Sequence, residues 1–158
     1  APDAADAEGR TPLMRAAAGG HAPAVVALLA GGAAVEAADP FGNTALLHAA
    51  AEGHVEVAAR LLEAGADPDR CTTEKGTCAL GLAAARDDVD LARLLLDAGA
   101  DLERRDREAE LTPLAAAAFL GRPAVAALLL ERGADPDAPD RTGGTPLMSA
   151  ARRAASRR

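Results

Sequence analysis

The sequence predicts an all-α solenoid of stacked helix-turn-helix units, and two observations carry that prediction. A block that opens on Thr-Pro-Leu or a variant of it, and then runs into alanines, recurs from positions 11, 44, 78, 112 and 145, at spacings of 33 or 34 residues. Each of the first four openings is followed 21 residues later by a Gly-Ala pair. A fixed period in this range indicates a repeat array, in which neighbouring units bury a shared core.

The first predicted helix of each repeat begins at the opening of the block. A Thr hydroxyl can accept a hydrogen bond from an unpaired N–H of the first turn, and Pro fits the first helical position because its missing N–H is not needed there. Thr11-Pro12, Thr112-Pro113 and Thr145-Pro146 have this form. The helix then continues on alanines, whose small side chains allow a neighbouring helix to approach closely.

The second predicted helix carries the larger apolar residues at helical spacing, such as Val57, Leu61 and Leu62 in one repeat and Leu91 and Leu95 in the next. The glycine that ends each block suits a left-handed helix cap. The stretches between blocks are rich in Asp, Pro and Gly, which are turn residues. Each repeat therefore reads as helix, turn, helix and loop.

These motifs resemble the ankyrin-repeat family over about residues 6–151. The matches in one repeat are Asp39, Gly42, Thr44, Leu46, Ala49, Ala50, Gly53, His54, Val57, Leu61, Leu62, Gly65, Ala66 and Asp67. The resemblance implies short β-hairpin fingers that project sideways from the stack. It also implies one domain over residues 1–158, with repeats at about 6–38, 39–71, 72–105 and 106–139 and a partial fifth at 140–158.

The chain departs from the family at the motif histidine. Its place is taken by Met14, Leu47, Gly81, Ala115 and Met148. We expect the loop hydrogen bonds of that histidine to be weaker or replaced, without loss of the fold.

Composition limits the classes of function. The chain has 44 alanines, two Phe and no Trp or Tyr, which suits a thin stack of helices better than a globular enzyme with a large core. The formal net charge is −7 and the terminal arginines hide a more acidic body, which argues against nucleic-acid binding. The longest apolar run, 24–35, is too short to cross a bilayer. We expect a monomer in the cytoplasm, without membrane insertion.

Residues that could carry chemistry favour structural roles. Cys71 and Cys78 flank one finger, where a hairpin could bring them together, but we expect free thiols because only two cysteines are present and no secretory signal precedes them. His21 and His54 hold equivalent, structural positions, and His48 is expected to be partly exposed. No nucleophile–base pair or phosphate-binding loop stands out. The sequence therefore predicts no enzyme, no cofactor and no metal site.

Three functions remain open. The leading one is a protein–protein interaction module that binds a partner protein through its concave groove and finger tips. The alternative is a regulatory or targeting segment cut from a larger multidomain protein or enzyme, suggested by the absent initiator Met and the unfinished fifth repeat, although the terminal RRAASRR could instead be a polar end-cap. An engineered scaffold is the third, disfavoured by irregularities such as the 34-residue repeats and Glu110 at a finger glycine position.

The predicted binding surface comes from the residues that end each first helix and from those just before each block. The predicted partner-binding residues are Phe41, Asn43, Glu52, Arg86, Leu111, Phe119, Leu120, Arg152 and Arg153. Phe119, Leu120 and Leu111 are expected to form an apolar patch with Arg152 and Arg153 beside it, because aromatic and Arg residues are enriched in binding hot spots. The alternative is that Phe119 folds back to fill space left by Ala115 and Ala116.

Overall fold

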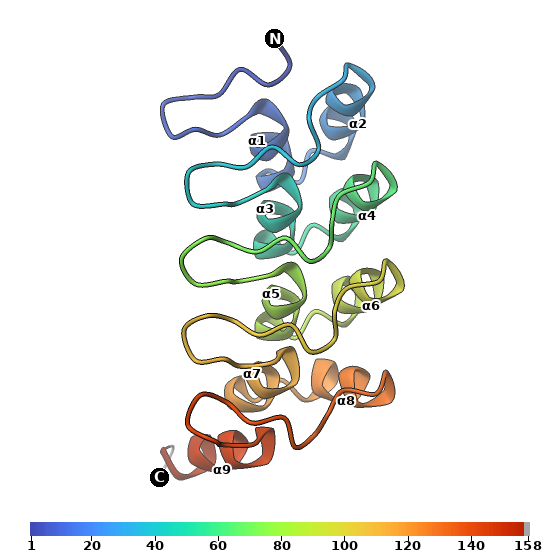
Figure 1. The fold of residues 1–158 in the computed structure, drawn as a ribbon. Helices are drawn as coiled ribbons and strands as arrows, with labels where there is room; N and C mark the ends of the chain where they lie inside the picture. The colour runs from blue at the N-terminus through green and yellow to red at the C-terminus, as the bar shows by residue number, and fades with distance from the viewer. Residues whose placement is uncertain (157–158) are drawn as a thin grey trace.

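The computed structural model describes residues 1–156 as a stack of five repeats (Figure 1). Residues 157–158, the end of the predicted partial fifth repeat, lie outside the described residues. The helices are α1 (Pro12–Ala18), α2 (Ala22–Ala30), α3 (Ala45–Glu52), α4 (Val55–Glu63), α5 (Ala79–Arg86), α6 (Val89–Asp97), α7 (Pro113–Leu120), α8 (Pro123–Glu131) and α9 (Pro146–Ser156). The predicted all-helical solenoid is confirmed.

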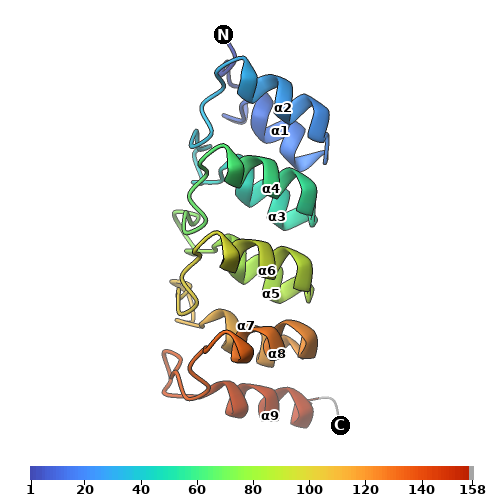
Figure 2. The ribbon, with the colours of Figure 1, turned by 90° about the vertical axis from the view of Figure 1, so that its right-hand side faces the viewer.

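The helices form two rows (Figures 1 and 2). Helices α1, α3, α5, α7 and α9 make an inner row, and α2, α4, α6 and α8 make an outer row beside it. The connecting loops extend past the inner row as fingers, at residues 6–10, 39–43, 72–77, 106–111 and 140–144, on the side away from the outer row. The inner row and the fingers thus form one side of the molecule.

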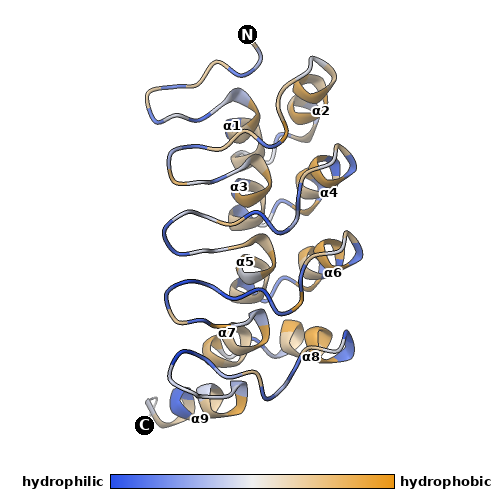
Figure 3. Ribbon diagram, viewed as in Figure 1, coloured by the Kyte–Doolittle hydropathy of each residue, from blue (hydrophilic) through white to orange (hydrophobic). Residues whose placement is uncertain are grey.

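The core lies between the two rows and between successive repeats. Leu46, Leu61 and Leu95 are almost completely buried, and the inner helices contact one another through buried alanines such as Ala17 and Ala50. Apolar residues gather on the helices, while the fingers and loops are mostly hydrophilic (Figure 3). The alanines lie between successive inner helices as the sequence predicts, while large buried residues come from both rows, such as Leu46 on α3 and Leu95 on α6.

In the repeats that open on Thr, the first helix begins as predicted, with the Thr side chain as its cap. The hydroxyl of Thr11 accepts a hydrogen bond from the N–H of Met14, and that of Thr112 accepts one from Ala115 (3.2 Å). The glycines that end the outer helices, such as Gly65 and Gly99, have φ near +90°. These local features are the ones predicted from the repeat pattern.

Acidic residues tie each repeat to the next. The N–H groups of Ala34, Asp67, Asp101 and Asp135 donate to the carboxylates of Asp3, Glu36, Asp69 and Glu103 respectively, at 2.8–2.9 Å. The bond to Asp3 ties the N-terminal segment to the first repeat, and the other three each cross one junction between repeats, so several of the chain's many acidic residues have a structural role.

The fingers hold no regular strand within residues 1–156. Two of them contain an isolated β-bridge, between Ala38 and Thr44 and between Cys71 and Cys78. Neighbouring fingers are joined by single backbone bonds, such as Thr73 N–H to the Phe41 carbonyl (2.9 Å) and Arg107 N–H to the Lys75 carbonyl (2.8 Å). The second to fifth fingers are therefore joined along one edge of the molecule.

The expectation of free thiols was wrong, because Cys71 and Cys78 form a disulfide. The two residues are direct bridge partners across the third finger, which places their Cα atoms 4.3 Å apart. This finger has Thr72 where its neighbours have Asp39 and Asp106, whose carboxylates hold the finger N–H groups. The disulfide thus closes the finger that lacks the acidic anchor.

Candidate functional site

The candidate site is the side of the molecule formed by the inner row and the fingers. We call the exposed and half-buried residues of the inner helices the inner surface. It contains Arg15, Ala18, His48, Ala51, Glu52, Leu82, Ala85, Arg86, Ala116, Phe119, Leu120, Arg152 and Arg153. Most of the residues predicted to bind a partner lie on this surface, and the others lie on the adjacent fingers.

Phe41 and Asn43 come together at a hollow of about 260 Å³ between the second and third fingers. Its walls also include His48 and Ala51 from α3 and Leu82 from α5. The side chain of Phe41 is 60% exposed. Asn43, however, donates its amide N–H to the Asp39 carboxylate (2.9 Å), so it holds the finger together as well as lining the hollow.

His48, in the wall of this hollow, pairs with Asp39, the carboxylate that holds the second finger. Burial raises the pKa of Asp39, but hydrogen bonds from the Asn43 side chain and from the N–H groups of Asn43 and Phe41 outweigh it and leave the pKa below its usual value. Burial lowers the pKa of His48, and the Asp39 carboxylate 3.7 Å from its Nε2 opposes that shift only in part. His48 is partly exposed, as expected.

Arg86 contacts the preceding repeat. Its guanidinium donates to the carbonyls of Ala51 (2.8 Å) and Glu52 (3.1 Å) at the end of α3. It packs over Gly53, where a β-carbon would meet it. Arg86 is therefore both an exposed cation and a cap for the last carbonyls of the neighbouring helix.

Arg153 repeats this arrangement two repeats later. Its Nη1 donates to the carbonyl of Phe119 (3.3 Å), and its side chain packs over Gly121. The ring of Phe119 is 48% exposed and is not part of the core cluster, so the alternative in which it fills the interior does not hold. Leu120 beside it is half-buried and Arg152 is exposed.

Leu111 lies apart from this group. It precedes α7, whereas Phe119 and Leu120 end that helix, and an eight-residue helix is about 12 Å long. The predicted patch of three residues is therefore a pair, Phe119 and Leu120, with Leu111 at the other end of the helix.

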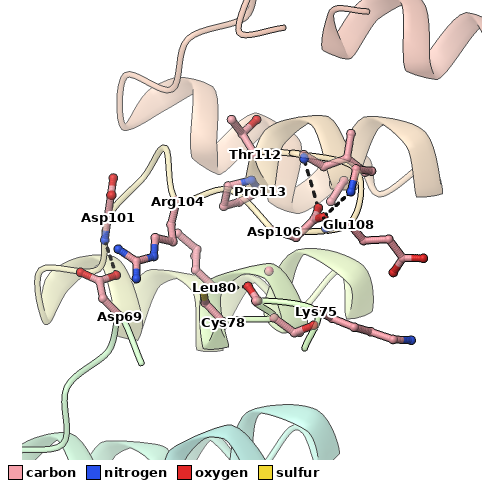
Figure 4. Close-up of a pocket in the computed structure, with 16 residues that line it drawn as sticks. Asp69, Lys75, Cys78, Leu80, Asp101, Arg104, Asp106, Glu108, Thr112 and Pro113 are labelled. Carbon is pink, nitrogen blue, oxygen red and sulfur yellow. Dashed lines mark hydrogen bonds between the residues drawn. The ribbon is translucent and has the colours of Figure 1, made fainter. Parts of the chain in front are cut away.

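Leu111 lines a second hollow of about 320 Å³, between the third and fourth fingers (Figure 4). Leu80 lies on one side of it and Pro113, from the next repeat, on the other. A β-carbon at Gly81 would meet nothing within 4 Å, while the equivalent Met14 and Leu47 are buried side chains. The hollow exists because Gly81 supplies no side chain. The sequence already indicates this, since Gly81 stands at the position of the family's motif histidine.

His54 has the structural role expected of it. Its Nε2 lies 3.1 Å from the carbonyl oxygen of Ala18, and its ring packs over Gly20. Within residues 1–156 the structure brings together no group of three or more His, Cys, Asp or Glu side chains that could hold a metal ion. None of the described helices is long and apolar enough to cross a membrane.

A family model for ankyrin repeats in three copies matches residues 1–72, 59–140 and 80–156. The chain belongs to the ankyrin-repeat family. A search of curated proteins gave no match. Ankyrin repeats are protein–protein interaction modules and are typically non-catalytic. The resemblance stated from Asp39, Thr44 and Gly65 is thereby confirmed, and the inner surface becomes the place to look for a partner.

Proposed function

We propose that this ankyrin-repeat protein binds a partner protein through its inner surface and finger tips, without catalysis. The observation that carries the proposal is the exposed ring of Phe119, which lies beside Leu120 and is followed in the next repeat by Arg152 and Arg153. Soluble proteins bury most large aromatic side chains, and an exposed one beside arginines is typical of a binding hot spot.

The test is to capture partners from a lysate of the source cells with the wild-type chain and to measure their affinity for Phe119→Ala. We expect the Kd to rise about 30-fold, the equivalent of about 2 kcal/mol, because the ring supplies a buried anchor in the complex. The melting temperature should stay nearly unchanged, since the ring is outside the core.

Leu130 provides the matched control. It is equally exposed in the same repeat but lies on the outer row, so Leu130→Ala should leave the affinity at the wild-type value. If Phe119→Ala unfolds the protein, or if both variants bind as the wild type does, the partner docks elsewhere.

One observation stands against the expected cytoplasmic location. Disulfides are rare in the reducing cytosol, and Cys71 is paired with Cys78. Trapping free thiols by alkylation at the moment of cell lysis decides the point, because a cytoplasmic chain would be labelled at both cysteines and one in an oxidising compartment at neither.

A further inference from the structure

The inner row carries only positive charge over its last three helices. Among the residues of α5, α7 and α9, the charged ones are Arg86, Arg152 and Arg153. The outer helices α6 and α8 beside them carry Asp90, Asp97 and Glu131 against a single Arg93. An acidic protein thus presents a basic strip on its inner surface, between Arg86 and Arg153.

The guanidinium groups of this strip form no salt bridge within residues 1–156. Arg86 and Arg153 donate to backbone carbonyls, and neither they nor Arg152 takes part in an ion pair there. Arg15, on the first inner helix, differs because it is paired with Asp6 at 3.2 Å.

The carboxylates nearest to the strip already accept backbone hydrogen bonds. Asp87 accepts from Val125 N–H and Asp88 from Leu91 N–H, next to Arg86. Asp140, whose pKa is lowered chiefly by the Thr142 hydroxyl and the Gly144 N–H and in smaller part by Arg152, is held within its finger. Glu52 is the remaining exposed carboxylate beside Arg86.

Apolar surface lies between the cations. Phe119 and Leu120 belong to the fourth repeat, Arg86 to the third, and Arg152 and Arg153 to the fifth. Packed helices lie about 8–10 Å apart, so the two ends of the strip are separated by roughly 16–20 Å. An extended chain rises about 3.3 Å per residue and would cover that span in five or six residues.

We propose that the occupant of this strip is an extended acidic segment of the partner protein. An apolar side chain of the segment lies on Phe119 and Leu120, and carboxylates five or six residues apart face Arg86 at one end and Arg152 with Arg153 at the other. The inference rests on the proposed function and specifies its partner chemistry. A nucleic acid is a poorer match because it carries a phosphate at every nucleotide, whereas the cations of the strip lie only at its two ends, with the apolar Phe119 and Leu120 between them.

The experiment measures binding of fluorescent peptides to the full chain by anisotropy at low ionic strength. The probe is a Gly/Ser peptide with a Leu at its centre. A pair of Glu residues lies about three positions from the Leu on each side, so that the two pairs are about six residues apart. We expect the Glu peptide to bind, and at least tenfold loss of affinity when Glu is replaced by Lys, when Leu is replaced by Ala, or when the salt concentration is raised tenfold.

Arg152→Ser tests the strip on the protein side, because the structure gives its side chain no capping bond to lose. It should weaken the Glu peptide several-fold, whereas Arg93→Ser removes an equally exposed cation from the outer row and should not. Arg152→Glu should reverse the preference toward the Lys peptide.

Three results would overturn the inference: no binding of the Glu peptide, equal weakening by Arg93→Ser, or tighter binding of a single-stranded oligonucleotide that Arg152→Ser abolishes. If the Glu peptide fails while Phe119→Ala still releases the captured partner, the docking surface stands and only the partner chemistry is wrong. If Phe119→Ala has no effect on capture, the proposed function itself fails.

Discussion

The carboxylate of Asp87 accepts a hydrogen bond from the backbone N–H of Val125 at 2.9 Å, across the junction between the third and fourth repeats. Val125 is the third residue of α8, a helix whose own N-cap residue, Arg122, makes no side-chain capping bond. Asp87 therefore caps a helix of the next repeat. It does so from a left-handed backbone conformation (φ 59°), where the first, second and fourth repeats have Gly20, Gly53 and Gly121.

Asp87→Ala should lower the free energy of unfolding by about 1–2 kcal/mol, since it removes this cap and leaves the left-handed strain in place. Asp87→Asn, which keeps an oxygen acceptor and tolerates left-handed φ, should cost less than half as much. Urea unfolding of the two variants measures the difference. Equal losses would show that the bond to Val125 contributes nothing.

Glu110→Gly should raise the free energy of unfolding by about 0.5–1 kcal/mol. Glu110 has φ 56° at a finger position where Gly42, Gly76 and Gly143 also have positive φ, and glycine adopts this region without steric cost. Its exposed ion pair with Arg141, at 3.8 Å, is worth little. Glu110→Ala is the matched control, because it removes the same carboxylate and keeps the strain; stabilisation by both variants would point to charge instead of backbone.

Gly81→Ala should stabilise the protein by about 1 kcal/mol, because glycine inside a helix costs that much and a β-carbon at this position meets nothing within 4 Å. Gly99→Ala, equally unobstructed but at φ 90°, should destabilise it. Thermal unfolding distinguishes the two. A loss of stability for Gly81→Ala would mean that the hollow beside Leu80 and Pro113 is filled by a neighbouring side chain in solution.

Reduction of the Cys71–Cys78 disulfide should lower the free energy of unfolding by roughly 2–3 kcal/mol, the entropy of closing a short loop. Urea unfolding with and without reductant measures it. The variant with Ser at both positions should have the same urea midpoint with and without reductant. An identical wild-type midpoint in both buffers would show that the disulfide contributes nothing to stability.

Stability should fall on mild acidification because of His48. Its folded pKa lies below the ordinary 6.5, so as the pH drops the unfolded chain takes up the proton first and unfolding is favoured. The contribution is fully present above pH 6.5 and is lost as the pH falls through the folded pKa. His48→Gln should flatten the stability profile in that window, as urea unfolding at a series of pH values would measure. A profile for His48→Gln that runs parallel to that of the wild type would contradict the assignment.

The sequence predicted features whose cause is local. The Thr-Pro helix starts, the left-handed glycines such as Gly65 and the buried leucines such as Leu95 follow from spacing and residue type, and all are confirmed. The disulfide was considered and rejected, because the sequence has only two cysteines and no secretory signal. That argument concerns the redox compartment, whereas the pairing follows from Cys71 and Cys78 facing each other across one finger.

The candidate site was predicted as a set of positions but not as contacts. Arg86 and Arg153 were expected at the surface, and both are there, yet their bonds to carbonyls 34 or 35 residues earlier depend on how one repeat settles on the next. Leu111 precedes α7 and Phe119 lies near the other end of that helix, so the length of the helix separates them in space. Whether any of these residues binds a partner stays a prediction.

The bonds that cross the junctions have a consequence for how such a molecule could change its size. Each joins residues 31 to 38 positions apart, from Asp67 with Glu36 to Val125 with Asp87, and therefore joins only adjacent repeats. The bonds from the N–H groups of Asp67, Asp101 and Asp135 to a carboxylate of the preceding repeat recur at three successive junctions, so a duplicated unit inserted at one of them would find this donor and this acceptor on its two sides. Adding or removing one repeat between Arg86 and Phe119 would change the length of the strip by one helix spacing. The side chains at the two ends of the strip would stay the same.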